Sequence, residues 1–286
     1  MLQASTVQLL RIKFSFFLMP VFWFALSQVE HIHIVHAISI FIILHLLVYP
    51  ASNGYNSYMD RDTQSIGGLK NPFMPTKELF YVTIVMDIVA LIASAFISVY
   101  CAICVAGFIA ASRAYSYRGI RLKKYPIIGF IVTIVFQGAV VYFFVNFGSS
   151  IHKILSFPYL PMMASALLIG SFYPLTQIYQ HEQDKADNVN TLSMLLGYNG
   201  TFIFSGLTFF MAMSTLAIYF GFNLDFINII TITIFTLPVL YYFFGWLIKV
   251  RKDKTEANFK NTMRMNVIAS ICTNAAFIAV LLIEKF

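Results

Sequence analysis

The sequence has few charged residues and few cysteines. Only 11% of its 286 residues are Asp, Glu, Lys or Arg, whereas a typical soluble domain carries about 25%. This composition excludes an ordinary water-soluble fold. The three cysteines cannot form a paired disulfide framework. The single C-x-x-C of Cys101 and Cys104 lacks the second pair of a zinc site, so we interpret these two as small apolar residues near a helix end.

Apolar and aromatic residues dominate the chain instead. Hydrophobic residues make up 59% of it, with 30 Phe and 16 Tyr. A bilayer-spanning helix needs about 17 to 25 mostly apolar residues. Suitable stretches occur at nine places: 12–29, 34–54, 79–97, 99–117, 126–147, 154–178, 195–221, 226–248 and 264–284. We predict an all-α polytopic membrane protein with one domain over 1–286, in which nine transmembrane helices surround a central cavity.

The positions of Lys and Arg indicate how this bundle is oriented. With nine spans, 17 of the 19 Lys and Arg residues fall on the side of the N-terminus, and only Lys153 and Lys285 fall on the other. Positive residues gather in cytoplasmic loops. We therefore predict an N-in, C-out protein of the inner or plasma membrane. The net charge of +7 is then a topology signal, so we expect a lipid bilayer and no nucleic acid as partner.

Polar residues recur at helical spacing after the second span. The segment "NGYNSYMDRDTQ" places Asn56, Asp60 and Gln64 four residues apart. If the helix continued through this segment, these three side chains would share one face, because residues four apart lie one turn apart. Its cytoplasmic end would then carry two amides around one carboxylate.

A matching set follows the sixth span. The segment "YQHEQDKADNVN" places Gln180, Asp184 and Asn188 at the same spacing of four. Facing carboxylates on two helix ends suit a hard divalent cation such as Mg²⁺, which prefers oxygen ligands and shares them with substrate phosphates. A solvated loop is the plainer interpretation of either set alone. The predicted Mg²⁺ ligands are Asp60, Asp184, Asn56, Gln64 and Gln180.

The loop after the fourth span is rich in cations. In "SRAYSYRGIRLKKYP" five basic residues surround Tyr115 and Tyr117. Guanidinium and ammonium groups are the expected partners of phosphate, although a cytoplasmic loop accounts for part of such a cluster. The predicted diphosphate-binding residues are Asn56, Arg61, Tyr115, Arg121, Lys123 and Lys185.

Taken together, the three polar segments resemble those of the UbiA-type intramembrane prenyltransferase superfamily. The resemblance covers essentially the whole chain. The family's N-D-x-x-D-x-x-x-D motif falls on Asn56, Ser57, Asp60 and Gln64; its D-x-x-x-D motif falls on Gln180 and Asp184; and its Y-S-(x)-R-L-K element falls on Tyr115, Ser116, Arg121, Leu122 and Lys123. Three family carboxylates are therefore replaced, by Ser57, Gln64 and Gln180.

This resemblance implies Mg²⁺-dependent transfer of an isoprenoid chain from a prenyl diphosphate to an aromatic or lipid-like acceptor within the membrane. The implied catalytic residues are Asp60, Asp184 and Lys123. Two alternatives remain: a catalytically degenerate isoprenoid-binding or partner protein, and a terpene cyclase without an acceptor. A transporter fits less well, because its polar groups would cluster near the bilayer midplane.

Two further polar residues are candidates for an acceptor pocket. Asp87 lies inside the third span, and an intramembrane acid indicates a functional site by default. It could face the cavity or hydrogen-bond to a neighbouring helix. Asn53 lies about one turn before Asn56, so we expect it to face the same cavity.

Overall fold

The computed structural model describes residues 2–285, which form helices and two isolated β-bridges but no strand. The helices of the first half are α1 (Ala4–Leu9), η1 (Ile12–Leu18), α2 (Met19–Ser27), α3 (Ile34–Ile42), η2 (Ile43–Val48), α4 (Tyr49–Asp60), α5 (Lys77–Ile97), α6 (Val99–Ser116) and η3 (Leu122–Lys124). Those of the second half are α7 (Pro126–Ile134), η4 (Val135–Val140), α8 (Val141–Ser149), α9 (Tyr159–Gln177), α10 (His181–Ala186), α11 (Leu192–Phe222), α12 (Phe226–Lys252), η5 (Lys254–Glu256) and α13 (Phe259–Lys285). The prediction of an all-α fold is confirmed.

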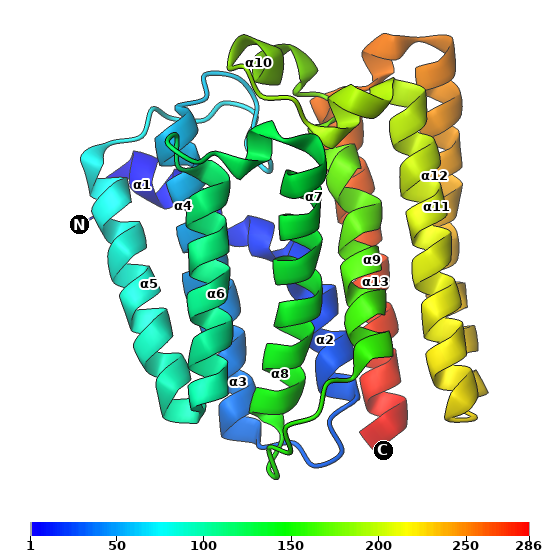
Figure 1. The fold of residues 1–286 in the computed structure, drawn as a ribbon. Coiled ribbons are helices and arrows are strands. Elements are labelled where there is room, and N and C mark those ends of the chain that lie inside the picture. The colour runs from blue at the N-terminus through cyan, green and yellow to red at the C-terminus, as the bar shows by residue number, and fades with distance from the viewer. Residues whose placement is uncertain (1, 286) are drawn as a thin grey trace.

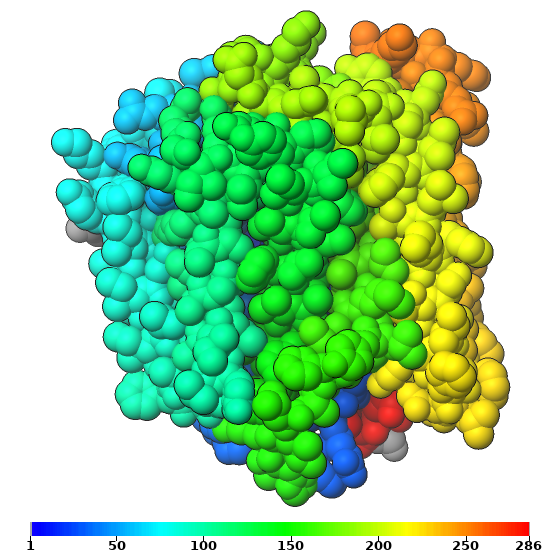
Figure 2. Space-filling model, viewed as in Figure 1, coloured from blue at the N-terminus to red at the C-terminus, as the bar shows by residue number. Residues whose placement is uncertain are grey.

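The long helices stand side by side in one bundle, and the short α10 lies across one of its ends (Figure 1). The last helix, α13, packs against both α12 and α2, so an early helix and the last helix of the chain meet in the bundle. Figure 2 shows that side chains of α5 to α8 and α11 cover one face almost continuously. Many of these are large apolar residues that stay exposed, such as Phe96, Tyr81 and Phe210, as a surface in contact with lipid requires.

In the described chain, eight helical segments are long and apolar enough to cross a membrane. They correspond to every predicted span except 154–178, which contains the 19-residue helix α9. This confirms an integral membrane protein. The count of nine spans and the N-in, C-out orientation remain predictions.

The first long polar segment differs from the sequence expectation. Helix α4 continues past 54 to Asp60, and then Arg61 adopts a left-handed conformation with φ of 56°. Its N–H still donates to the Ser57 carbonyl at 3.1 Å, as in a helix, but its left-handed backbone turns the chain away and ends α4. The expected common face of Asn56, Asp60 and Gln64 is therefore wrong for Gln64, whose side chain lies exposed on the loop.

The first of these eight segments, Ala4–Ser27, is also interrupted. Arg11 has a φ of 48° and separates α1 from η1. In Figure 1, η1 runs across the interior of the bundle before α2 turns along it. It contacts α4 on one side and α13 on the other. Consequently Arg11 and Phe14 are carried beneath the polar end of the bundle.

Candidate active site

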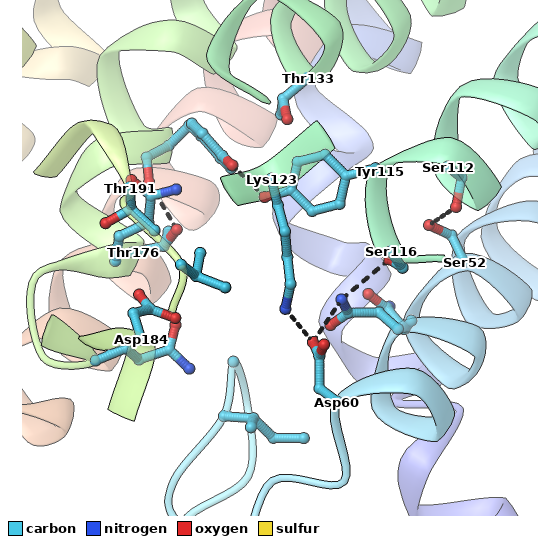
Figure 3. Close-up of a pocket in the computed structure, with 18 of the residues that line it drawn as sticks. Ser52, Asp60, Ser112, Tyr115, Ser116, Lys123, Thr133, Thr176, Asp184 and Thr191 are labelled. Carbon is cyan, nitrogen blue, oxygen red and sulfur yellow. Dashed lines mark hydrogen bonds and ion pairs between the residues drawn. The ribbon is translucent and has the colours of Figure 1, made fainter. Parts of the chain in front are cut away.

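Polar side chains from several segments line a cavity of about 1230 Å³, a volume that includes its open mouth. Residues from α4, α6, η3, α9 and α10 contribute to its wall, so segments distant in the sequence meet there (Figure 3). Seven residues singled out from the sequence lie in this lining: Asn53, Asn56, Asp60, Tyr115, Lys123, Gln180 and Asp184.

The side chain of Asp60 is only 3% exposed. One oxygen accepts hydrogen bonds from the Asn56 amide at 2.9 Å and from the Lys123 ammonium at 2.5 Å. Asn56, one turn earlier on α4, also donates to the Ser116 hydroxyl at 3.1 Å. The second oxygen lies 3.6 Å from the Arg121 guanidinium. Asp60 is thereby held directly by η3 and its N-terminal flank, and through Asn56 it is also connected to α6.

Lys123 occupies the centre of the site. It belongs to the short helix η3, which follows a left-handed Arg121. Its ammonium points towards Asp60, and Asp184 lies on the opposite side (Figure 3). A flexible ammonium that pairs with one carboxylate and faces another can leave its partner to bind an anion such as a phosphate.

Asp184, on α10, lines the same cavity. Burial raises the pKa of its carboxyl to about 7, and repulsion from Asp62, Asp60 and Asp187 adds to this, while Lys123 opposes it. Within residues 2–285 no ion pair involves Asp184. The carboxyl group is thus buried in an excess of negative charge, and an added cation would relieve that excess.

These oxygen donors match the ligand preference of a divalent cation. Asp184 has no cation of its own, and Asp60 could exchange Lys123 for one. Yet within the described chain no three His, Cys, Asp or Glu side chains converge closely enough to hold a metal ion. The residues therefore fit Mg²⁺ in chemistry, with further oxygens coming from water or a substrate.

The arginines of the loop between α6 and α7 hold other loops in place. Arg121 pairs with Asp187 through its guanidinium and also donates to the Asp187 carbonyl at 3.2 Å. Arg118 donates to the Met59 carbonyl at 2.8 Å and lies 3.5 Å from Asp187. Arg121 was predicted to contact the diphosphate, but it does not line the cavity. It instead connects η3 to the loop after α10.

Besides Arg121 and Asp87, three predicted site residues lie outside the cavity lining. Arg61 is exposed, with its guanidinium 6.0 Å from the Tyr58 ring. Lys185 and Gln64 are exposed as well. The two glutamines do not face each other, because only Gln180 lines the cavity, where its amide donates to the Ser65 carbonyl at 3.4 Å.

Asp62 enters the cavity in place of Gln64. The left-handed Arg61 turns the chain so that the Asp62 side chain points inwards and accepts a hydrogen bond from Gln183 on α10. Burial raises the pKa of Asp62, and the nearby Asp60 raises it further. Asp62 thus brings a carboxylate into the cavity, whereas Gln64, two residues later, lies outside it.

The intramembrane Asp87 does not line the cavity. It pairs with Arg113 of α6, whose guanidinium also donates to the Thr83 carbonyl at 3.3 Å and lies 3.9 Å from the Tyr55 ring. Of the two roles considered for Asp87, the structure shows the bond to a neighbouring helix. The acceptor-pocket assignment of Asp87 is therefore corrected, whereas Asn53 does line the cavity.

Arg11 is a site residue that the sequence did not reveal. Its guanidinium donates to the Gly67 and Asn53 carbonyls, each at 3.1 Å, and thereby joins η1 to α4 and to the loop after it. In the sequence it resembles any positive residue flanking a first span. No local pattern distinguishes it, because its partners come from two other segments.

The chain is similar to known membrane proteins. The sequence profile described as the UbiA prenyltransferase family matches residues 17–268. No curated protein matches the chain. A UbiA homolog from Archaeoglobus fulgidus bound to DMAPP and Mg²⁺ has a TM-score of 0.68 at 17% identity, with 98% of this chain and 100% of that one covered. An apo UbiA homolog from Aeropyrum pernix K1 has a TM-score of 0.65 at 16% identity, with 94% and 98% covered.

A structure of digeranylgeranylglyceryl phosphate synthase is also similar, with a TM-score of 0.59 at 16% identity and with 97% of this chain and 96% of that one covered. At these identities the solved structures show a common fold. The family profile covers most of the chain and includes all three polar segments. The chain belongs to the UbiA prenyltransferase family.

Proposed function

We propose that this protein transfers an isoprenoid chain from a prenyl diphosphate to an aromatic or lipid-like acceptor within the membrane, with Mg²⁺ as cofactor. One observation carries the proposal: Asp60 and Asp184, from two polar segments far apart in the sequence, line one cavity with Lys123 between them (Figure 3). A cavity with carboxylates on two sides and an ammonium in the centre suits a diphosphate accompanied by divalent cations.

Different residues of the cavity would bind the metal ion and the diphosphate. Asp60 and Asp184 would hold Mg²⁺, with the amide oxygens of Asn56 and Gln180 available beside them. Lys123 would leave Asp60 and bind the diphosphate directly. When bound, Mg²⁺ neutralises negative charge on the diphosphate, which makes it a better leaving group.

Below the polar rim the cavity becomes apolar. Phe108 of α6, Val132 of α7 and Phe136 of η4 line it there, and they offer a hydrocarbon surface for the isoprenoid chain. When the allylic C1–O bond breaks, its electron pair leaves with the diphosphate. Aromatic ring faces such as those of Phe108 and Phe136 can stabilise the positive charge left on the allyl group. The acceptor then gives an electron pair to C1 and loses a proton to the released diphosphate.

Two comparisons support this proposal. The chain belongs to the UbiA prenyltransferase family, and the similar Archaeoglobus fulgidus homolog was solved with DMAPP and Mg²⁺. An alternative is that the protein binds a prenyl diphosphate without transferring its isoprenoid chain. The substitution of Gln180 for a family carboxylate and the Asp60–Lys123 pair favour this alternative.

Diphosphate release decides between these functions. Purified protein would be incubated with geranylgeranyl or farnesyl diphosphate, Mg²⁺ and a membrane lipid extract as the source of acceptor, with binding and release measured in parallel. We expect release that is lost in Asp60→Ala and kept in Asp253→Ala, an exposed carboxylate outside the cavity. Binding without release, and without an effect of Asp60→Ala, would favour the binding protein. Release accompanied by a cyclic hydrocarbon and no prenylated acceptor would identify a terpene cyclase.

A further inference from the structure

The short helix α10 is held at the mouth of the cavity without a hydrophobic anchor. It has six residues, none of which is fully buried, and an isolated helix of fewer than about 12–15 residues is only marginally stable in water. It also lies across one end of the bundle and not within it (Figure 1). Polar contacts therefore decide where α10 and its Asp184 lie.

Electrostatic repulsion acts against the observed position of Asp184. Asp60 at the end of α4 and Asp62 in the loop after it both repel the Asp184 carboxylate. Lys123 attracts it, but the ammonium of Lys123 is paired with Asp60. In a cation-free cavity this repulsion favours an outward movement of α10, so contacts elsewhere on α10 have to oppose it.

His181, the first residue of α10, makes such a contact. Its Nε2 shares a hydrogen bond of 2.8 Å with the hydroxyl of Ser193, near the start of α11. Its ring is stacked on Tyr198, with the ring centroids 5.0 Å apart and the planes 4° apart. Ser193 is fully buried, which protects the hydrogen bond from water. His181 thus connects α10 to a buried part of α11.

Ser193 is itself held firmly in place. Its hydroxyl lies 3.0 Å from the Thr201 hydroxyl, and its N–H donates to the Gln177 side chain of α9 at 3.4 Å. In a continuous helix Ser193 and Thr201 would lie about 12 Å apart. Their contact depends on the break in α11 at Gly197, whose φ of 65° favours glycine.

The hydrogen bond between His181 and Ser193 closes the segment 181–193 into a loop whose ends meet. Compact loops of this kind are frequently functional. Inside the loop the Val189 N–H donates to the Asp184 carbonyl at 2.8 Å, so α10 and the turn after it form one unit. Five residues of this segment line the cavity: Gln183, Asp184, Asp187, Val189 and Thr191.

We propose that His181 is a positioning residue, which holds α10 through Ser193 and Tyr198 so that Asp184 lines the cavity. His181 does not line the cavity itself, so it acts on a bound cation only through α10. The inference rests on the proposed function, because it concerns the carboxylate that would bind Mg²⁺ in that reaction.

Cation binding tests this role without catalysis. Mn²⁺ would be titrated into the full chain in detergent micelles, with free Mn²⁺ followed by electron paramagnetic resonance. We expect His181→Leu to weaken Mn²⁺ binding about tenfold, which corresponds to about 1.4 kcal/mol at 25 °C, and His181→Gln to regain part of the loss. Backbone amides of 181–190 should exchange hydrogen faster in His181→Leu, whereas those of α9 should not.

His36→Leu is the matched control. His36 is also half-buried and stacked on an aromatic ring, that of His33, but it lies at the opposite end of the segment Ile34–Asp60 from Asp60. We expect this variant to bind Mn²⁺ like the unaltered protein. An equal loss in His36→Leu and His181→Leu would show a general packing effect and overturn the proposal.

A double-mutant cycle separates the hydrogen bond from independent effects of the two side chains. Ser193→Ala removes the same bond, so the double variant with His181→Leu should bind Mn²⁺ no more weakly than the weaker single variant. Losses that multiply in the double variant would overturn the proposal. If His181→Leu did not fold, unchanged Mn²⁺ binding by Ser193→Ala would overturn it as well.

Diphosphate release, measured on the same preparations, separates this inference from the proposed function. A loss of Mn²⁺ affinity in His181→Leu, in a protein that releases no diphosphate, would contradict only the proposed function. Diphosphate release by the unaltered protein, with the same Mn²⁺ affinity in His181→Leu, would contradict only the role of His181.

Discussion

Removing Arg113 alone should destabilise the protein strongly, because it would leave Asp87 ionised and unpaired inside the bundle. The two side chains are only 20% and 13% exposed, so solvent screens their charges little. Breaking such a buried pair by removing one partner costs about 3–5 kcal/mol. Loss of the guanidinium from the Tyr55 ring face, 3.9 Å away, should add about 1 kcal/mol. Arg113→Met should therefore lower the free energy of unfolding by about 4–6 kcal/mol.

The double variant Asp87→Leu with Arg113→Met separates a structural role from a functional one. Replacing both members of a buried ion pair with apolar side chains is often neutral, so we expect the double variant to regain most of the stability lost in Arg113→Met. Equilibrium unfolding in mixed SDS micelles measures this recovery, and diphosphate release by the double variant measures function. A folded, stable double variant without activity would refute the reasoning and return Asp87 to the acceptor pocket.

Three further predictions concern the cavity. Because the pKa of Asp184 is raised to about 7, the cation-free protein should lose stability as pH rises from about 4 through about 7. The affinity for Mn²⁺, measured by the shift in thermal unfolding, should rise about tenfold between about pH 6 and 8. In Asp184→Asn this affinity should not change with pH. Lys123→Met should weaken prenyl diphosphate binding by about tenfold or more, whereas Lys185→Met, at an exposed lysine, should change it less than about twofold. Equal losses in a radioligand binding assay would contradict the central place of Lys123. Gln180→Asp adds a negative charge inside the cavity and should tighten Mn²⁺ binding at least about threefold. Gln64→Asp adds its charge outside the cavity and should not. Tighter Mn²⁺ binding by Gln64→Asp than by Gln180→Asp would show that position 64 reaches the metal.

Much of this molecule could be predicted from local patterns. Long apolar stretches predict membrane helices because a bilayer forces the backbone to satisfy its own hydrogen bonds. Polar residues such as Asp60, at the end of one stretch, and Asp184, after another, therefore stand out. Their spacing and order were enough to indicate the UbiA family and to place the candidate site at one end of the bundle. Lys123 could be selected for the same reason.

The residues that sequence reasoning misplaced depend on contacts between distant segments. Helical spacing predicted that Gln64 continues the face of Asp60, but this holds only while the helix continues. Helices commonly end at a left-handed Gly or Asn, and here the left-handed residue is Arg61, which gives no such signal. Asp62 consequently takes the position in the cavity that was expected for Gln64.

The sequence by itself determined that this chain is a helical membrane protein with polar segments at its helix ends, because hydrophobicity and residue spacing are local properties. Only the tertiary structure decided which charges meet. It paired Asp87 with Arg113 across two helices and brought Arg11 beneath the loop after α4. It also left the amide nitrogen of the buried Asn266, on α13, without a hydrogen-bond partner among the described residues. Whether a buried polar group finds a partner depends on how the helices pack, and no single segment encodes that.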